Sequence, residues 1–127
     1  MIMYYSCFIR KGGLGERKTE MYLGEGKKEL IFEPAFLKGN ICHASNICLM
    51  DSGAIGAVWF AGKKEGTEDV SIWKSLCRDG KWSIPQMAAH DAKEAHWNPV
   101  LYQRQDGKVL LLYKVGNRIS RWYTNCR

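Results

Sequence analysis

Several familiar sequence signals are missing from this chain of 127 residues. No apolar run is long enough to cross a membrane, so no membrane association is expected. The five cysteines form no CxxC pair and no cysteine–histidine spacing of a zinc site, so neither a metal nor a cofactor is expected. The glycines at 12, 13 and 15 do not lie between a strand and a helix, which excludes the nucleotide-binding fingerprint. Ser52 lacks the glycine that precedes a serine-nucleophile elbow. Neither of the last two absences excludes hydrolysis by carboxylates.

A dense basic run is also missing, although the formal net charge is +6. This charge makes phosphate, nucleic acid, acidic sugars and anionic membranes candidate partners. The basic residues are scattered, however, and the densest clusters are the pairs Lys27-Lys28 and Lys63-Lys64. The pattern favours a solvated basic surface, and without an RNP-type motif no nucleic-acid partner is expected.

The cysteines, an odd set, do not resemble a disulfide framework. Cys42 and Cys48 are an even number of positions apart, which predicts that they share one face of a strand as free buried thiols. The apolar N-terminus precedes Arg10 and Lys11 without a small-residue cleavage site, so it is interpreted as a strand and not a signal peptide. A reducing, cytoplasmic location is favoured.

The composition, 46% hydrophobic and 25% charged, is that of a folded domain. Short apolar runs punctuated by glycine-containing turns predict an all-β fold. The predicted strands are residues 41–50, 54–61, 69–76, 82–88, 98–103, 108–114 and 119–125. Tight turns are expected at Asp51-Ser52-Gly53, Asp79-Gly80 and Asp106-Gly107, because Gly and Asp tolerate a positive φ.

The N-terminal part of the chain differs from the rest, and we predict a boundary between residues 1–28 and 29–127. Residues 10–28 contain five glycines among charges and predict a loop with a short strand near residues 20–23. The segment from Glu29 is predicted to be an edge strand that Pro34 stops.

A weak internal repeat of about 50 residues relates the region after His43 to the region after His96. The alignment places Gly53 with Gly107, residues 59–60 with 112–113, Gly62 with Gly116 and residues 72–75 with 121–124. All-β repeats of this length indicate propeller blades, one at about 41–90 and one at about 96–127.

Six short motifs, taken in order, carry a family resemblance. They are His43-Ala-Ser, Trp59-Phe-Ala-Gly-Lys-Lys-Glu-Gly, Asp69-Val-Ser-Ile-Trp, Gly80-Lys-Trp-Ser-Ile-Pro, His96-Trp-Asn-Pro-Val, and Tyr113-Lys-Val-Gly followed by Ser120-Arg-Trp-Tyr. In addition, Ser75-Leu-Cys-Arg-Asp-Gly-Lys-Trp82 resembles a degenerate Asp-box turn. Residues 29–125 therefore resemble the sialidase-like BNR-repeat family of β-propellers.

The resemblance implies about two four-stranded blades of a propeller that closes with five or six. Because two blades cannot cover both of their lateral faces, we expect either a piece of a longer protein or an assembly of copies. A trimer of two-blade chains would close six blades.

The resemblance also implies a ligand site where the first strand of each blade begins. Asp69 and Glu65 are the candidate general acids, since they follow the second strand of the first blade, where sialidases carry a catalytic Asp. His43 stands near the position of an arginine that grips the sialic carboxylate, which makes sialic acid itself a doubtful ligand. The candidate substrate-binding residues are His43, Lys64, His96, Trp97, Asn98, Lys114 and Arg121.

Each of these residues also has a structural interpretation. Asp69 and Glu65 could equally solvate a hairpin loop, and His43 and His96 could equally be structural. Asn98 before Pro99 also marks a turn, and isolated surface cations can bind nothing specific.

Two functions are therefore open. The first is a sialidase-like glycoside hydrolase acting on a terminal, perhaps acidic sugar, or an incomplete part of one, because the tyrosine–glutamate nucleophile of that family would come from later blades. The alternative is a non-catalytic, lectin-like propeller protein assembled from several chains.

Overall fold

The computed structural model describes residues 2–5, 27–37 and 40–127, in two compact units of residues 1–31 and 32–127. In the first unit, β1 (Ile2–Tyr5) pairs antiparallel with β2 (Lys27–Leu30). The strand predicted from Glu29 to Pro34 ends at Leu30, and a 3-10 helix spans Pro34–Leu37, because the fixed φ of proline suits the start of a helix. The strand expected near residues 20–23 lies outside the described residues. The predicted division of the chain at residues 28/29 stays a prediction.

The first sheet of the second unit is an antiparallel meander. It contains β3 (Ile41–Leu49), β4 (Ile55–Gly62), β5 (Ser71–Arg78), β6 (Lys81–Trp82) and β7 (Gln86–Ala89). The strand predicted over 82–88 is broken in two, and both parts pair with β5. Between them lie Pro85, which has no N–H to donate, and Ser83, whose carbonyl accepts a hydrogen bond from the Ser75 hydroxyl at 2.7 Å. Because β6 and β7 both pair with β5, they share the fourth strand position, and the sheet has the layout of a four-stranded blade.

The second sheet contains β8 (His96–Gln103), β9 (Val109–Val115) and β10 (Tyr123–Cys126). β8 begins two residues before its predicted start. The strand predicted over 119–125 is wrong in its first part, because Ile119–Arg121 form a 3-10 helix and pairing with β9 begins only at Tyr123. The all-β fold is confirmed, and the two antiparallel sheets are consistent with partial propeller blades.

Positive φ angles mark the tight turns predicted from Gly and Asp. Gly53 has φ 80°, Gly107 has φ 81°, and the β5–β6 turn has Asp79 at 51° followed by Gly80 at 73°. Two consecutive left-handed residues are what a two-residue hairpin of type I′ requires. These turns are therefore confirmed.

The first strand of each sheet carries a bulge at the same place. Ala44 and Asn98 both have a left-handed backbone, with φ 49° and 45°, and the pairing register shifts between His43 and Asn46 and between Trp97 and Val100. A bulge adds one residue to one strand of a pair, which changes the faces of the residues that follow. The bulges are thus a shared feature of the two repeats.

These bulges correct the internal alignment. His43 pairs with Phe60 just before the first bulge, and Trp97 pairs with Lys114 just before the second, so His43 is equivalent to Trp97 and not to His96. The alignment of residues 72–75 with 121–124 is also wrong, because Ile72 pairs with Phe60 as Thr124 pairs with Lys114. The two histidines are not a repeated pair.

The bulge also overturns the prediction that Cys42 and Cys48 share a face. Cys42 pairs with Ala61 and Cys48 with Gly56, and these two partners are an odd number of positions apart on β4. Their side chains therefore lie on opposite faces of the sheet. Both thiols are free and half-buried, and burial raises the pKa of Cys42, against a smaller lowering by the Trp59 side chain.

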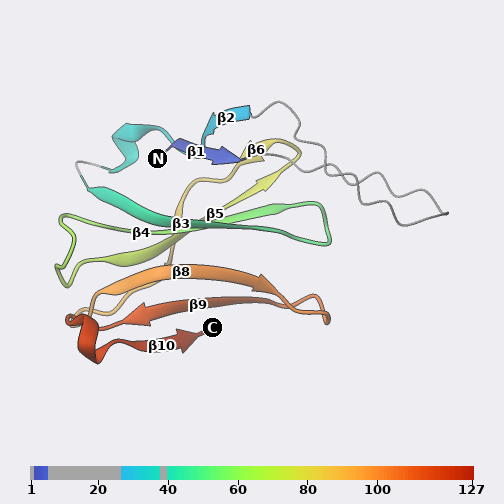
Figure 1. The fold of residues 1–127 in the computed structure, drawn as a ribbon. Coiled ribbons are helices and arrows are strands. Elements are labelled where there is room, and N and C mark those ends of the chain that lie inside the picture. The colour runs from blue at the N-terminus through green and yellow to red at the C-terminus, as the bar shows by residue number, and fades with distance from the viewer. Residues whose placement is uncertain (1, 6–26, 38–39) are drawn as a thin grey trace. The chain divides into compact units, whose positions relative to one another are not determined.

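The two sheets pack against each other through a shared core, with β3 and β8 next to one another (Figure 1). Two side-chain amides join these strands, because Asn46 accepts a hydrogen bond from the Leu101 N–H and Gln103 accepts one from the Asp51 N–H, both at 2.8 Å. The core cluster contains Phe60, Val70, Ile72, Ala89, Ala95, Trp97, Tyr113 and Val115. No helix among the described residues is long and apolar enough to span a membrane.

The opposite face of the first sheet is covered by the segment 32–37. Phe32 stacks on Trp59 with ring centroids 5.1 Å apart, and Phe36 meets Trp73 edge-on at 5.7 Å. Trp59 pairs with Trp73 across β4 and β5, and both side chains lie on the face of the sheet opposite to that of Val58. This aromatic cover gives the first sheet a packed layer on both faces.

Candidate functional site

The segments that carry the predicted site residues lie at one end of the two sheets. Strand β3 starts beside the end of β4, since Ile41 pairs with Gly62. The His96 N–H donates to the Val70 carbonyl at 3.0 Å, and the Gly116 N–H donates to the Ala95 carbonyl at 3.0 Å. Figure 1 shows the start of β3, the end of β4, the start of β8 and the end of β9 at the same side of the view. We call this end of the second unit the rim.

His43 is exposed at the rim above a series of aromatic contacts. Its ring lies 5.7 Å from that of Phe60, which lies 5.3 Å from Trp97, which in turn stacks on Trp122 at 5.4 Å. Phe60 and Trp97 are buried and hold the series in place. The imidazole is therefore a fixed, accessible group with an aromatic ring behind it.

His96 and Trp97, by contrast, are buried. His96 is 3% exposed and packs edge-on against Tyr113 at 5.0 Å, and its Nδ1 and the Tyr113 hydroxyl have no hydrogen-bond partner among the described residues. Burial lowers the pKa of His96, although the Ala89 carbonyl opposes this shift. Trp97 donates its indole N–H to the Gly116 carbonyl at 2.8 Å. Their burial favours the structural interpretation over a ligand contact.

Asp69 stabilises the loop between β4 and β5. Its carboxylate accepts a hydrogen bond from the Lys63 N–H at 2.8 Å. The Thr67 hydroxyl and the Lys63 N–H hold the pKa of Asp69 below its ordinary value. The hydrogen bond from Lys63 is the better supported of the two, because the Thr67 hydroxyl has only one proton and donates it to the Lys64 carbonyl at 2.6 Å. A carboxyl with a lowered pKa is ionised at neutral pH and is poorly suited to donate a proton.

The remaining candidates lie on the surface of the rim. Glu65 and Lys64 are exposed in the same loop as Asp69, and Arg121 is exposed at the end of the second 3-10 helix. Lys114 donates a hydrogen bond from Nζ to the Thr124 hydroxyl at 2.7 Å. None of these contacts by itself marks a catalytic arrangement.

Asn98 is exposed, and its backbone conformation is imposed by the bulge.

Among the residues that the structure describes, no group of three or more His, Cys, Asp or Glu side chains could hold a metal ion. The accessible polar groups of the rim are thus hydrogen-bonding and cationic side chains, with three carboxylates, Glu65, Glu68 and Asp69, in the β4–β5 loop.

One family matches the chain: the BNR repeat-like domain, over residues 53–127. This match covers more than half of the sequence and every strand of the second unit except β3 (Ile41–Leu49). The chain belongs to the BNR-repeat-like family. No curated protein and no solved structure gave a match.

Within this BNR-repeat-like unit, a concave region lies away from the rim. A cavity of about 570 Å³ lies between the two sheets, and its lining includes Lys74, Gln86 and Arg127. These three residues were not predictable from the sequence, because they are distant from one another along the chain and lie outside the six motifs. Only their pairing across the two sheets brings them to one cavity.

Proposed function

We propose that the chain is a glycan-binding part of a sialidase-like propeller and that its ligand site is the rim around His43 and Asn98. The carrying observation is the pair of matching left-handed bulges at Ala44 and Asn98. Each bulge interrupts strand pairing at the start of a first strand, and His43 beside the first bulge and Asn98 in the second are exposed, whereas Trp97 and Pro99 are buried.

The chemistry of these groups suits a sugar. The His43 imidazole and the Asn98 amide both donate and accept hydrogen bonds, as sugar hydroxyls do. Lys114 and Arg121 add positive charge at the same end, which favours an acidic substituent. Imidazole does not form the permanently charged clamp that arginine forms, so the positive charge for an acidic sugar would come from Lys114 and Arg121.

A sialidase-like hydrolase is the second candidate function. It is favoured by the place of Asp69 and Glu65 in the β4–β5 loop at the rim. The hydrogen bonds that lower the pKa of Asp69 weigh against this residue as the proton donor, so binding without turnover is the first choice.

The test compares binding and turnover on the same protein. Oligosaccharides ending in glucuronic acid, sialic acid or galactose are titrated calorimetrically into the wild type and into the His43→Ala and Asn98→Gly variants. Glycine keeps the left-handed backbone at position 98, so this variant removes only the amide. We expect the two acidic ligands to bind better than the galactose ligand and both variants to weaken them at least about tenfold.

The control is Gln105→Ala, an exposed residue in the turn between β8 and β9, which should leave affinity unchanged. Fluorogenic glycosides are assayed in parallel with the wild type and Asp69→Asn. Wild-type turnover that Asp69→Asn abolishes would replace the binding proposal with the hydrolase. Affinity that neither rim variant alters would place the site elsewhere.

A further inference from the structure

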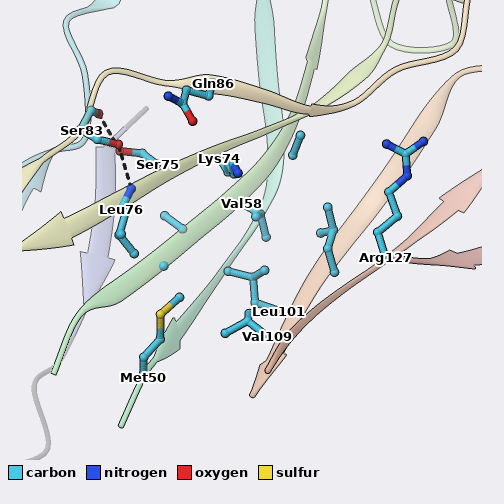
Figure 2. Close-up of a pocket in the computed structure, with 14 residues that line it drawn as sticks. Met50, Val58, Lys74, Ser75, Leu76, Ser83, Gln86, Leu101, Val109 and Arg127 are labelled. Atoms are coloured by element: carbon cyan, nitrogen blue, oxygen red, sulfur yellow. Dashed lines mark hydrogen bonds between the residues drawn. The ribbon is translucent and has the colours of Figure 1, made fainter. Parts of the chain in front are cut away.

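The cavity between the two sheets lies apart from the aromatic contacts at the rim. It has a volume of about 570 Å³, within the range of small-molecule sites. Met50 and Gly56, where the first two strands meet, line one part of it, so the cavity extends toward the end of the sheets opposite the rim. Figure 2 shows Met50, Leu101 and Val109 in its lower part and Gln86 and the Arg127 guanidinium in its upper part.

Strand pairing explains this separation of apolar and polar groups. In the first sheet, Val58 pairs with Lys74 and Lys74 with Gln86, so the three side chains form one row across β4, β5 and β7. All three line the cavity. The row is apolar at Val58 on β4 and polar at Lys74 on β5 and Gln86 on β7.

The second sheet repeats this gradient on the facing wall. Leu101 pairs with Leu111, and the Leu111 N–H and carbonyl exchange hydrogen bonds with the backbone of Arg127 at 2.8 and 3.0 Å. Leu101, Leu111 and Arg127 therefore form a second row that runs from apolar to cationic. Two facing rows with the same gradient make a cavity with an apolar inner part and a polar mouth.

The charged side chains that line the cavity are all cationic. Lys74 and Arg127 are exposed at the mouth, and none of the 14 lining residues is acidic. Among the described residues, neither Lys74 nor Arg127 forms a salt bridge. A salt bridge does join Arg104 to Asp106, which do not line the cavity. An anion at the mouth would thus meet two cations and the Gln86 amide.

We propose that this cavity binds an amphipathic anion, namely a medium-chain carboxylate whose alkyl tail lies between Val58, Leu101 and Leu111 and whose head group meets Lys74 and Arg127. The tail gains from leaving water, and the carboxylate gains charge-assisted hydrogen bonds. The proposal is independent of glycan binding, because it uses none of the rim residues.

Calorimetric titration of the full chain with decanoate, decan-1-ol and butyrate tests the proposal. Decanoate carries both tail and charge, decan-1-ol only the tail, and butyrate the charge with a short tail. We expect saturable one-to-one binding of decanoate, and binding of each of the other two at least about tenfold weaker.

Two sets of variants separate the mouth from the apolar part. Lys74→Gln combined with Arg127→Gln should lower decanoate affinity to that of decan-1-ol, whereas Lys108→Gln, which removes an exposed cation outside the cavity, should not. Val109→Trp should fill the cavity from a residue that is 36% exposed, and Leu101→Phe is the second filling variant. Circular dichroism and cooperative urea unfolding verify that each variant is folded.

The proposal fails if folded wild type shows no saturable decanoate binding, or if decan-1-ol binds equally well. It also fails if both filling variants are folded and bind decanoate unchanged, or if the mouth variant matches Lys108→Gln.

Discussion

Asp69 illustrates how a single carboxylate can be explained by its own loop. The Lys63 N–H needs an acceptor where β4 ends, and the carboxylate of Asp69 supplies it six residues later. A buried or loop-bound N–H without an acceptor would cost free energy, so this contact stabilises the turn that leads into β5. The sequence indicated a carboxylate in a hairpin loop, but only the geometry shows which group it contacts.

Replacing Asp69 with asparagine should lower the free energy of unfolding by roughly 1 kcal/mol at neutral pH, because the amide oxygen can still accept the Lys63 N–H but loses the extra strength of a hydrogen bond to an ionised acceptor. The folded pKa of Asp69 lies below its ordinary value of 3.8, so the stabilisation is present above that pH and is lost as the pH falls through the folded pKa. Urea unfolding of wild type and variant should therefore differ at neutral pH and converge as the pH falls through the folded pKa of Asp69.

Glu68→Gln serves as the control, because Glu68 is exposed in the same loop and accepts no recorded hydrogen bond among the described residues. It should leave stability unchanged at both pH values. An Asp69→Asn deficit that stays the same in acid would contradict the assignment of the stabilisation to the ionised carboxylate.

The strands and turns were predictable because each has a local signal. Short apolar runs and glycine-containing turns located β3, β4, β5 and β9 to within about two residues. The bulges were not predictable, because Ala44 has no residue-specific preference for a positive φ. This one missed feature caused both the false His43–His96 equivalence and the false common face for Cys42 and Cys48. His96 and Trp97 were predicted to contact the ligand, but both are buried. Their burial depends on packing between the sheets, for which the sequence has no local signal.

The bulge in β8 makes a prediction about Asn98. Asparagine tolerates the left-handed conformation better than most residues, and glycine tolerates it best, so Asn98→Gly should change stability by less than about 0.5 kcal/mol. A β-branched residue clashes with its own backbone in that conformation, so Asn98→Val should cost roughly 1–2 kcal/mol. Thermal and urea unfolding measure both values.

The matched control is Tyr102→Val, an exposed position on the same strand without a positive φ. Valine suits an ordinary strand, so this variant should cost little. If Asn98→Val were as stable as Tyr102→Val, the bulge would not be fixed in solution.

At the scale of the second unit, the two sheets differ in how their faces are covered. The face of the first sheet that carries Val58 packs on the second sheet. The equivalent face of the second sheet carries Leu112, Val100 and Tyr102. Nothing in the second unit covers this face fully, since the side chains of Val100 and Tyr102 are 46% and 55% exposed. By the repeat equivalence, this open face is where a further blade would pack. The trimer expected from the sequence would use the Trp59 face of the next copy, but Phe32 and Phe36 already cover that face.

We therefore expect weak, concentration-dependent self-association through the open face and no closed trimer. Sedimentation velocity of the wild type should show a sedimentation coefficient that rises with concentration, because exposed apolar faces associate. Val100→Lys combined with Tyr102→Lys should remove this rise, since two buried ammonium groups would oppose the contact. Ile84→Lys is the control: Ile84 is 77% exposed but lies between β6 and β7, away from the open face, so its variant should associate like the wild type. A discrete trimer at all concentrations would mean that the Phe32–Phe36 segment leaves the Trp59 face on assembly, and that the ring closes as the blade architecture first indicated.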